Sequence, residues 1–161
     1  MVELKFADMI EYINNRFVWR RRTTLGMGKV FADIELLNGD DVAFARNNII
    51  GEDEIRRISI RPQVDTGADY LCINENIQEV LKLPFSRFEN VLLADGQVVR
   101  YEVVGPVDVR FENRGCNCEA MVLPGGAGPL LGLIALESMD VIIDPRREEL
   151  VVNPDGPMTR L

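Results

Sequence analysis

Asp65-Thr66-Gly67-Ala68-Asp69 is the stretch of this sequence that decides the fold, because it lies between a predicted strand and a predicted helix. Residues 55–64 form the expected strand and residues 74–83 the expected helix. A carboxylate at a strand end needs a sharp turn behind it, and Gly67 permits conformations and close approaches that other residues do not. Thr66 can hydrogen-bond to a neighbouring loop and fix the direction of the carboxylate. The pattern predicts a loop that presents Asp65.

The triplet Asp65-Thr66-Gly67 is weak evidence by itself. At average residue usage it occurs by chance in roughly 3% of chains of this length. An ordinary turn with a satisfied aspartate is the alternative interpretation, so the surrounding sequence has to decide between them.

The sequence around this stretch predicts short strands joined by turns. Asp95-Gly96 marks the bend of one hairpin, and residues 113–115 mark the bend of another. Residues 40–54 are mixed and polar, which predicts a long loop or an irregular hairpin, and residues 134–138 predict a short helix. The remaining predicted strands are residues 29–37, 91–94, 97–104, 107–111, 116–123, 141–143 and 150–152. The expected class is mostly β, an antiparallel barrel or folded sheet.

Residues 1–26 differ from the rest of the chain. Apolar residues recur there at three- and four-residue spacing, which predicts an amphipathic helix over residues 8–19 that closes on Arg20-Arg21-Arg22. These cations indicate either a solvated helix end or a patch that contacts DNA or a membrane surface. Met27 opens a new section and is a candidate for an alternative start. The expected domains are residues 1–26, 27–154 and 155–161.

Charge and hydropathy narrow the function classes. The net charge of −8 argues against a nucleic-acid partner, which requires a basic surplus on the binding face. No run approaches 18 apolar residues, so no membrane segment is expected. Charged residues interrupt any apolar stretch at the N-terminus, which predicts no signal peptide and a cytoplasmic protein.

The chain contains no histidine, and this absence removes Ser-His-Asp and Cys-His catalysis and His-ligated zinc. Proton transfers in an enzyme would then fall to carboxylates, Lys, Tyr or Cys. Cys72, Cys116 and Cys118 lack the spacing of a zinc knuckle. Buried thiols are the main interpretation, with Cys116 and Cys118 on one strand face, and a redox or metal role is the alternative. No cofactor and no metal are expected.

Four segments in order resemble the retroviral-type (retropepsin-like) aspartic proteases: the opening strand, the loop, a flap and a glycine motif. Val64-Asp65-Thr66-Gly67-Ala68-Asp69 resembles the active-site loop of that family. The hairpin of residues 91–104, with Ala94-Asp95-Gly96-Gln97 at its bend, is similar to the flap. Leu130-Leu131-Gly132-Leu133-Ile134-Ala135-Leu136 is similar to the apolar pair, glycine and short helix that pack behind the loop. The likeness runs from about residue 29 to residue 152.

The resemblance implies a closed antiparallel barrel or folded sheet with a flap hairpin and short helices, and an aspartic endopeptidase that acts on peptides or proteins. It implies Asp65, Thr66 and Gly67 as catalytic residues. The implied substrate-binding residues are Ala68, Asp69, Ala94, Asp95, Gly96 and Gln97. The sequence departs from the family at residues 40–54, which are longer than the usual connection, and at the flap bend, which lacks Tyr and Trp. Tyr101 lies on the returning strand instead.

One Asp-Thr-Gly in a chain of 161 residues implies two chains. Hydrolysis without a metal or a nucleophile needs a base for water and an acid for the leaving amine. Two carboxyl groups about 3 Å apart supply both because they share one proton, as in aspartic proteases generally. A twofold homodimer would bring Asp65 opposite its own copy. Residues 141–143 and 150–152 are candidates for dimer contacts or, equally, for interior packing.

Two other functions stay open at this point. The same fold can serve as a non-catalytic module that dimerises or binds peptides, since fold does not dictate function. The basic end of the N-terminal helix can instead tether the protein to nucleic acid or to an anionic membrane.

Overall fold

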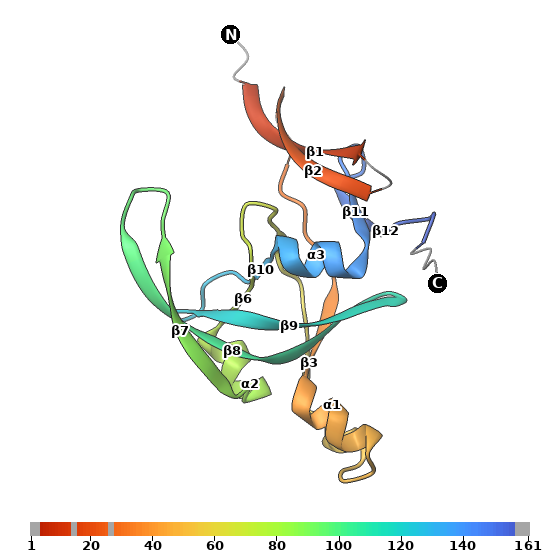
Figure 1. Cartoon of the computed structure of the whole chain (residues 1–161), viewed down its shortest axis with the longest axis vertical. Helices are drawn as coiled ribbons and strands as arrows, with labels where there is room; N and C mark the ends of the chain where they lie inside the picture. Colours follow the sequence, from red (N-terminus) through yellow and green to blue (C-terminus); the bar gives the residue numbers. More distant parts are fainter. Residues whose placement is uncertain (1–3, 14–15, 26–27, 157–161) are drawn as a thin grey trace.

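A computed structural model describes residues 4–13, 16–25 and 28–156, and it is mostly β (Figure 1). The main sheet has the order β4-β3-β8-β9-β6-β10-β5, and β7 pairs with β8 beside this path. Its strands are β3 (Ile34–Asn38), β4 (Arg57–Ile60), β5 (Gln63–Val64), β6 (Leu71–Asn74), β7 (Phe85–Leu92), β8 (Val98–Phe111), β9 (Arg114–Leu123) and β10 (Leu130–Leu131).

Two hairpins and a few short helices complete the chain. β1 (Leu4–Ile13) pairs with β2 (Arg16–Leu25), and β11 (Val141–Asp144) pairs with β12 (Glu149–Val152), each as a separate two-stranded sheet. The helices are α1 (Gly39–Arg46), the 3₁₀ turn η1 (Glu52–Glu54), α2 (Glu75–Leu81) and α3 (Leu133–Met139). None of the helices in the described ranges is long and apolar enough to cross a membrane.

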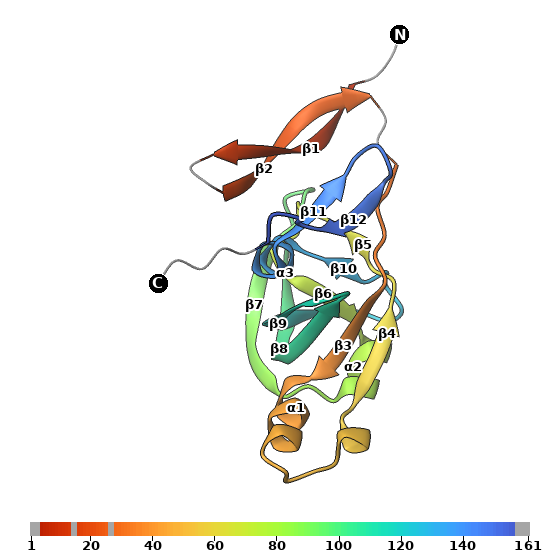
Figure 2. The same ribbon diagram turned by 90° about the vertical axis from the view of Figure 1, so that its right-hand side faces the viewer.

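The main sheet curls into half a barrel (Figure 2). A bridge between Phe31 and Gln63 and a hydrogen bond from the Val64 amide to the Val30 carbonyl (2.7 Å) bring β5 beside the segment that leads into β3. The sheet therefore curves back toward its own beginning. The mostly β class predicted from the sequence is confirmed. The sheet is mixed and not wholly antiparallel as expected, because β6 pairs with β9 and β5 pairs with β10 in parallel.

The core lies inside this curl and takes aliphatic side chains from the sheet and from α2 and α3. Leu36, Ile73, Val109, Leu131 and Leu136 have no exposed surface. Burying a side chain of this size contributes about 1.5–3 kcal/mol, so the sheet and the two helices are held chiefly by this cluster. Val141, Ile143 and Leu150 join it. The interior-packing interpretation of those three residues is thereby confirmed.

The predicted N-terminal helix over residues 8–19 is wrong, because these residues lie in the β1–β2 hairpin. Its register pairs Ile10 with Trp19 and Tyr12 with Phe17, which are residue types that strands favour. The apolar residues that recur every three or four positions also include alternating positions, so the segment fits both the helical period and the strand period. Strand pairing across the hairpin decided in favour of the strand. Arg20, Arg21 and Arg22 lie within β2, so the interpretation as a helix end is wrong as well.

The predicted loop at residues 40–54 is also wrong, since α1 and η1 occupy most of it. Asn38 caps α1 and two acidic residues occupy its first turn, which are signals of a helix start that the polar composition obscured. The predicted strand at residues 55–64 divides into β4 and β5. Pro62, which has no amide hydrogen to donate to a neighbouring strand, lies between them. The strand expected at residues 29–37 becomes regular only at Ile34.

The other predicted elements are confirmed in place, although β7 begins at Phe85, six residues before the strand expected at residues 91–94. Helices α2 and α3, the β7–β8 and β8–β9 hairpins and the β11–β12 pair all lie where the sequence indicated. β8 runs unbroken through two predicted strands, with an irregularity between Val104 and Val107.

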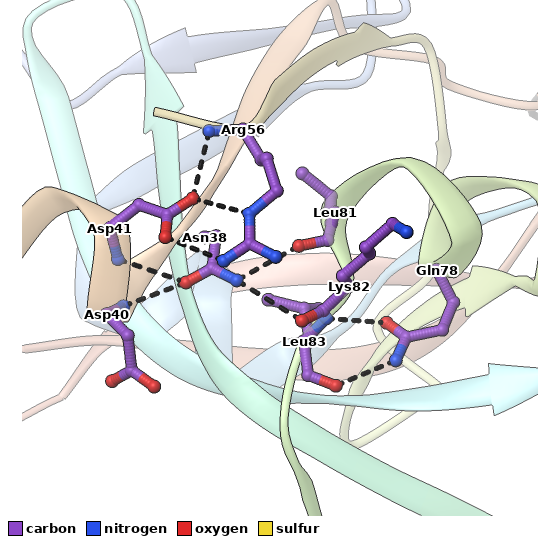
Figure 3. A network of polar contacts seen from close by, with 8 residues as sticks. All are labelled: Asn38, Asp40, Asp41, Arg56, Gln78, Leu81, Lys82 and Leu83. Carbon is purple, nitrogen blue, oxygen red and sulfur yellow. Dashed lines mark hydrogen bonds and ion pairs between the residues drawn. The ribbon is translucent and has the colours of Figure 1, made fainter. Parts of the chain in front are cut away.

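Asn38 ties α1 to α2 (Figure 3). Its side-chain oxygen accepts hydrogen bonds from the amides of Asp40 (3.0 Å) and Asp41 (3.1 Å), and its amide group donates to the Leu81 carbonyl (2.9 Å). Beside it, Arg56 binds the Asp41 carboxylate with two nitrogens at 2.7 Å, and this guanidinium holds the pKa of Asp41 below its usual range. These contacts hold the start of α1, the residue before β4 and the end of α2 together.

Asn38→Ala is expected to lower the free energy of unfolding by about 2–3 kcal/mol, measured by urea denaturation. The substitution removes the cap of α1 and leaves the Leu81 carbonyl without its donor at a site where Asn38 is only 1% exposed. Asn47→Ala is the matched control, because Asn47 makes an exposed bond to the Ala43 carbonyl (2.9 Å) at the other end of α1. It should cost about 0.5 kcal/mol, and equal losses in the two variants would contradict this account of Asn38.

Candidate functional site

The five residues from Asp65 to Asp69 form a compact turn at the end of β5. The Asp65 amide donates to the Leu131 carbonyl (3.0 Å), which continues the parallel pairing of β5 with β10. The Asp65 side chain is half-buried, and its Oδ1 accepts a hydrogen bond from the Gly67 amide (2.9 Å). The Ala68 amide returns to the Asp65 carbonyl (3.2 Å). Backbone and side-chain bonds within the turn therefore fix the direction of the carboxylate.

Strand β10 lies between β5 and β6, the two strands that the turn connects. The turn must cross over the end of β10, and Gly132 is the residue that it crosses. A Cβ atom on Gly132 would lie 2.2 Å from the Tyr70 carbonyl oxygen and 2.7 Å from that of Ala68, so only glycine fits. Gly132 has an extended backbone, and the close approach alone requires glycine there.

The start of α3 holds the turn from behind. The amides of Leu133 and Ile134 donate to the carbonyls of Ala68 (2.8 Å) and Asp69 (3.1 Å). The first amides of a helix have no partner within the helix, so this turn satisfies them while they fix its position. The segment from Leu130 to Leu136 thus packs behind the turn, as the resemblance implied.

The hairpin of β7 and β8 carries the other predicted site residues. Ala94, Asp95, Gly96 and Gln97 form its bend, and all four are exposed. Asp95 Oδ1 accepts from the Gln97 amide (3.0 Å), and Gly96 has a φ of 85°, which glycine adopts without strain. The bend is therefore a defined tight turn rather than a loose loop.

The structure brings the predicted residues together in two groups. Asp65, Thr66, Gly67, Ala68 and Asp69 form the turn, and the bend residues lie at the outer end of the hairpin, apart from the turn in the single chain (Figure 1). Leu92 and Val98, which pair beside the bend, are 71% and 65% exposed. The hairpin tip thus exposes two large apolar side chains.

Sequence reasoning missed a cluster of polar side chains next to the turn. Tyr70 directly follows Asp69, and its hydroxyl contacts Arg87 and Glu89 of β7. Burial raises the pKa of Tyr70, and the hydrogen bond to Glu89 raises it further. Arg87 also binds Glu119 of β9. No spacing in the sequence indicates this cluster, because strand pairing alone brings its members together.

Cys72 lies close behind the turn, where its thiol is 3.6 Å from the Tyr70 carbonyl. Burial raises the pKa of Cys72 to about 11, and the negative charge of Asp65 adds to this shift. The thiol is therefore protonated near neutral pH and is a poor nucleophile. Cys116 and Cys118 are half-buried on one face of β9 and pack against the core.

Neither a cluster of metal ligands nor one of the two surface hollows described below includes the turn, among the residues that the structure describes. Within residues 4–13, 16–25 and 28–156, no group of three or more Cys, Asp or Glu side chains is arranged to hold a metal ion. Two surface hollows are lined by residues of β3, β4 and β8 and by residues of β7, β8 and β9. Neither includes a residue of the turn or of the hairpin bend.

Comparison of the sequence with protein-family models and with curated proteins gives no match. The fold and the geometry of the turn therefore carry the functional argument.

Proposed function

We propose that the protein is a retropepsin-like aspartic endopeptidase that is active as a homodimer. One observation carries the proposal: the Asp65-Thr66-Gly67 turn lies braced over Gly132, between β5 and β6 and against the start of α3. This bracing holds a strand-end carboxylate rigidly, as acid–base catalysis requires. A surface aspartate in an ordinary turn has no need of a backbone crossing that excludes every side chain at Gly132.

The proposed reaction uses one Asp65 carboxyl group from each subunit. One carboxylate takes a proton from water, which attacks the scissile carbonyl, while the protonated mate polarises that carbonyl and then passes its proton to the departing amine. Titration belongs to the pair and not to either residue. Thr66 would orient the pair by bonding across the dimer, as the resemblance implies.

An extended peptide would bind between the turn and the hairpin. The backbone of the peptide would add to exposed strand edges, and its side chains would alternate between the two faces. The exposed apolar pair Leu92 and Val98 would close over it together with Ala94, Asp95, Gly96 and Gln97. Ala68 and Asp69 would line the floor beside Asp65.

A peptide-library digest tests this function, with sedimentation on the same samples. The proposal expects cleavage inside peptides, insensitive to chelators and to thiol reagents, in samples that sediment as dimers. Cleavage that depends on an added metal ion would contradict the mechanism. Peptide binding without turnover at any pH would instead favour a binding module.

A further inference from the structure

Tyr70 joins the turn to the root of the hairpin. Its hydroxyl donates to Glu89 Oε2 (2.9 Å) and accepts from Arg87 Nη2 (3.0 Å), and both partners lie on β7. Arg87 Nη2 also lies 3.1 Å from Glu89 Oε2. The three groups form a closed triangle in which each contacts the other two, so movement of any one disturbs both remaining contacts.

The second nitrogen of Arg87 extends the cluster to β9. Nη1 lies 2.7 Å from Glu119 Oε2, and the hydroxyl of Ser86 donates to the other oxygen of the same carboxylate at 2.9 Å. The Arg87 guanidinium holds the pKa of Glu119 below its usual range. Arg87 thus connects the residue after the turn with β7 and with β9, which a planar guanidinium with several donors can do and a lysine cannot.

The cluster marks the point at which the hairpin leaves the body of the protein. Glu89 is paired in register with Tyr101, and the pairing of β8 with β9 begins at the next residue, Glu102. Residues 90–100 extend beyond both attachments toward the exposed bend. The ring of Tyr70 packs on the small cluster of Cys72, Val103 and Met121 directly beneath this root.

We propose that Arg87 is a positioning residue for the hairpin: by binding Tyr70, Glu89 and Glu119 it holds the root of the hairpin against the turn that carries Asp65. It thereby sets where residues 94–97 lie relative to the turn and how readily the hairpin opens. The expected effect of Arg87 on substrate binding rests on the proposed peptidase function, whereas the attachment of the hairpin root is a property of the single chain.

The contribution of Arg87 depends on the cluster as a unit. A single exposed ion pair contributes little, because solvent screens it and two long side chains must be ordered. Here one guanidinium orders three partners from separate segments, and a half-buried tyrosine anchors it. Removing it should change the opening of the hairpin far more than the stability of the core, because the hairpin tip has few other attachments.

Hydrogen exchange tests the attachment without any substrate. Arg87→Met keeps most of the side-chain volume and removes the guanidinium, and it should make the amides of residues 86–100 exchange about three- to tenfold faster. Arg110→Met is the matched control: Arg110 is 43% exposed against 44% for Arg87 and pairs with Asp108 on its own strand (3.1 Å). It should leave residues 86–100 unchanged.

Tyr70→Phe is the second variant, and combining it with Arg87→Met gives a double-mutant cycle. It should increase exchange over the same residues, and the double variant with Arg87→Met should add little, because both changes break one cluster. Unchanged exchange in Arg87→Met, or fully additive effects, would overturn the inference.

The kinetic constants for a cleaved peptide distinguish the positioning role from misfolding, because misfolding lowers kcat and does not raise KM. Arg87→Met should raise KM about three- to tenfold with kcat within about twofold, and Arg87→Lys should recover part of the loss. A fall in kcat at unchanged KM would indicate fewer folded molecules and would overturn the positioning role. If the wild type cleaves no peptide, the proposed function fails, while the exchange measurements still decide the attachment.

Discussion

Asp65→Asn is expected to lower peptide hydrolysis by at least about a thousandfold while leaving the fold intact. Asparagine has nearly the same shape, and its side-chain oxygen can still accept the hydrogen bond that the Gly67 amide donates to Asp65 Oδ1 at 2.9 Å. The turn should therefore persist without a carboxylate to activate water. The measurement is the initial rate of cleavage of one library-derived peptide, with the free energy of unfolding from urea denaturation beside it.

Asp33→Asn is the control for the change of charge. The Asp33 side chain is 82% exposed and contacts only the similarly exposed Arg61 at 3.7 Å among its described ion pairs. Cleavage by this variant should stay within about twofold of the wild type, since surface substitutions of this kind have small effects. Equal cleavage by Asp65→Asn and the wild type would exclude Asp65 as the acid–base group.

Gly132→Ala is expected to be the most damaging single-methyl substitution in the site, with a loss of about 3 kcal/mol or more in the free energy of unfolding. The added Cβ would meet the carbonyl oxygens of Tyr70 (2.2 Å) and Ala68 (2.7 Å). Both are backbone atoms, so the turn itself must move to admit the methyl group. The variant should also lose activity beyond its loss of folded protein, because a displaced turn misdirects Asp65.

Gly128→Ala provides the comparison, since a Cβ at Gly128 meets nothing within 4 Å. Its unfolding free energy should stay within about 0.5 kcal/mol of the wild type. Equal stability of the two alanine variants would show that the turn is not braced over Gly132.

Local patterns in the sequence predicted the parts of the fold that depend on neighbouring residues. Asp95-Gly96 predicted the bend of the β7–β8 hairpin, and the stop before Pro84 predicted the end of α2. In each case the residue that decides the conformation lies inside or next to the element that it shapes.

One error and one omission arose where strand pairing decided the outcome. Residues 8–19 carry apolar residues at spacings compatible with a helix, yet pairing with a second strand made them part of a hairpin. The contacts of Arg87 with Tyr70 and with Glu119 join residues that are 17 and 32 positions apart in the sequence. Such contacts depend on strand order, which the period of a single segment does not contain.

The sequence placed the candidate site at the turn and at the hairpin bend, and the structure adds the contacts that hold these two segments. The sequence indicated that Gly67 is needed for the turn, whereas the tightest constraint lies at Gly132, 65 residues further along the chain. The helix-start amides at Leu133 and Ile134 that hold the carbonyls of the turn were likewise not visible from residue types.

Mixing wild-type and Asp65→Asn protein tests the central claim most directly, because each active molecule is proposed to need two Asp65 residues. After subunit exchange in a 1:1 mixture, about a quarter of the dimers are wild type on both sides, about half are mixed and about a quarter lack both carboxylates. If a mixed dimer cannot share a proton between two carboxyl groups, cleavage should fall to about a quarter of the rate of the undiluted wild type. A rate of about one half at every mixing time would show that each chain works alone and would contradict the shared site.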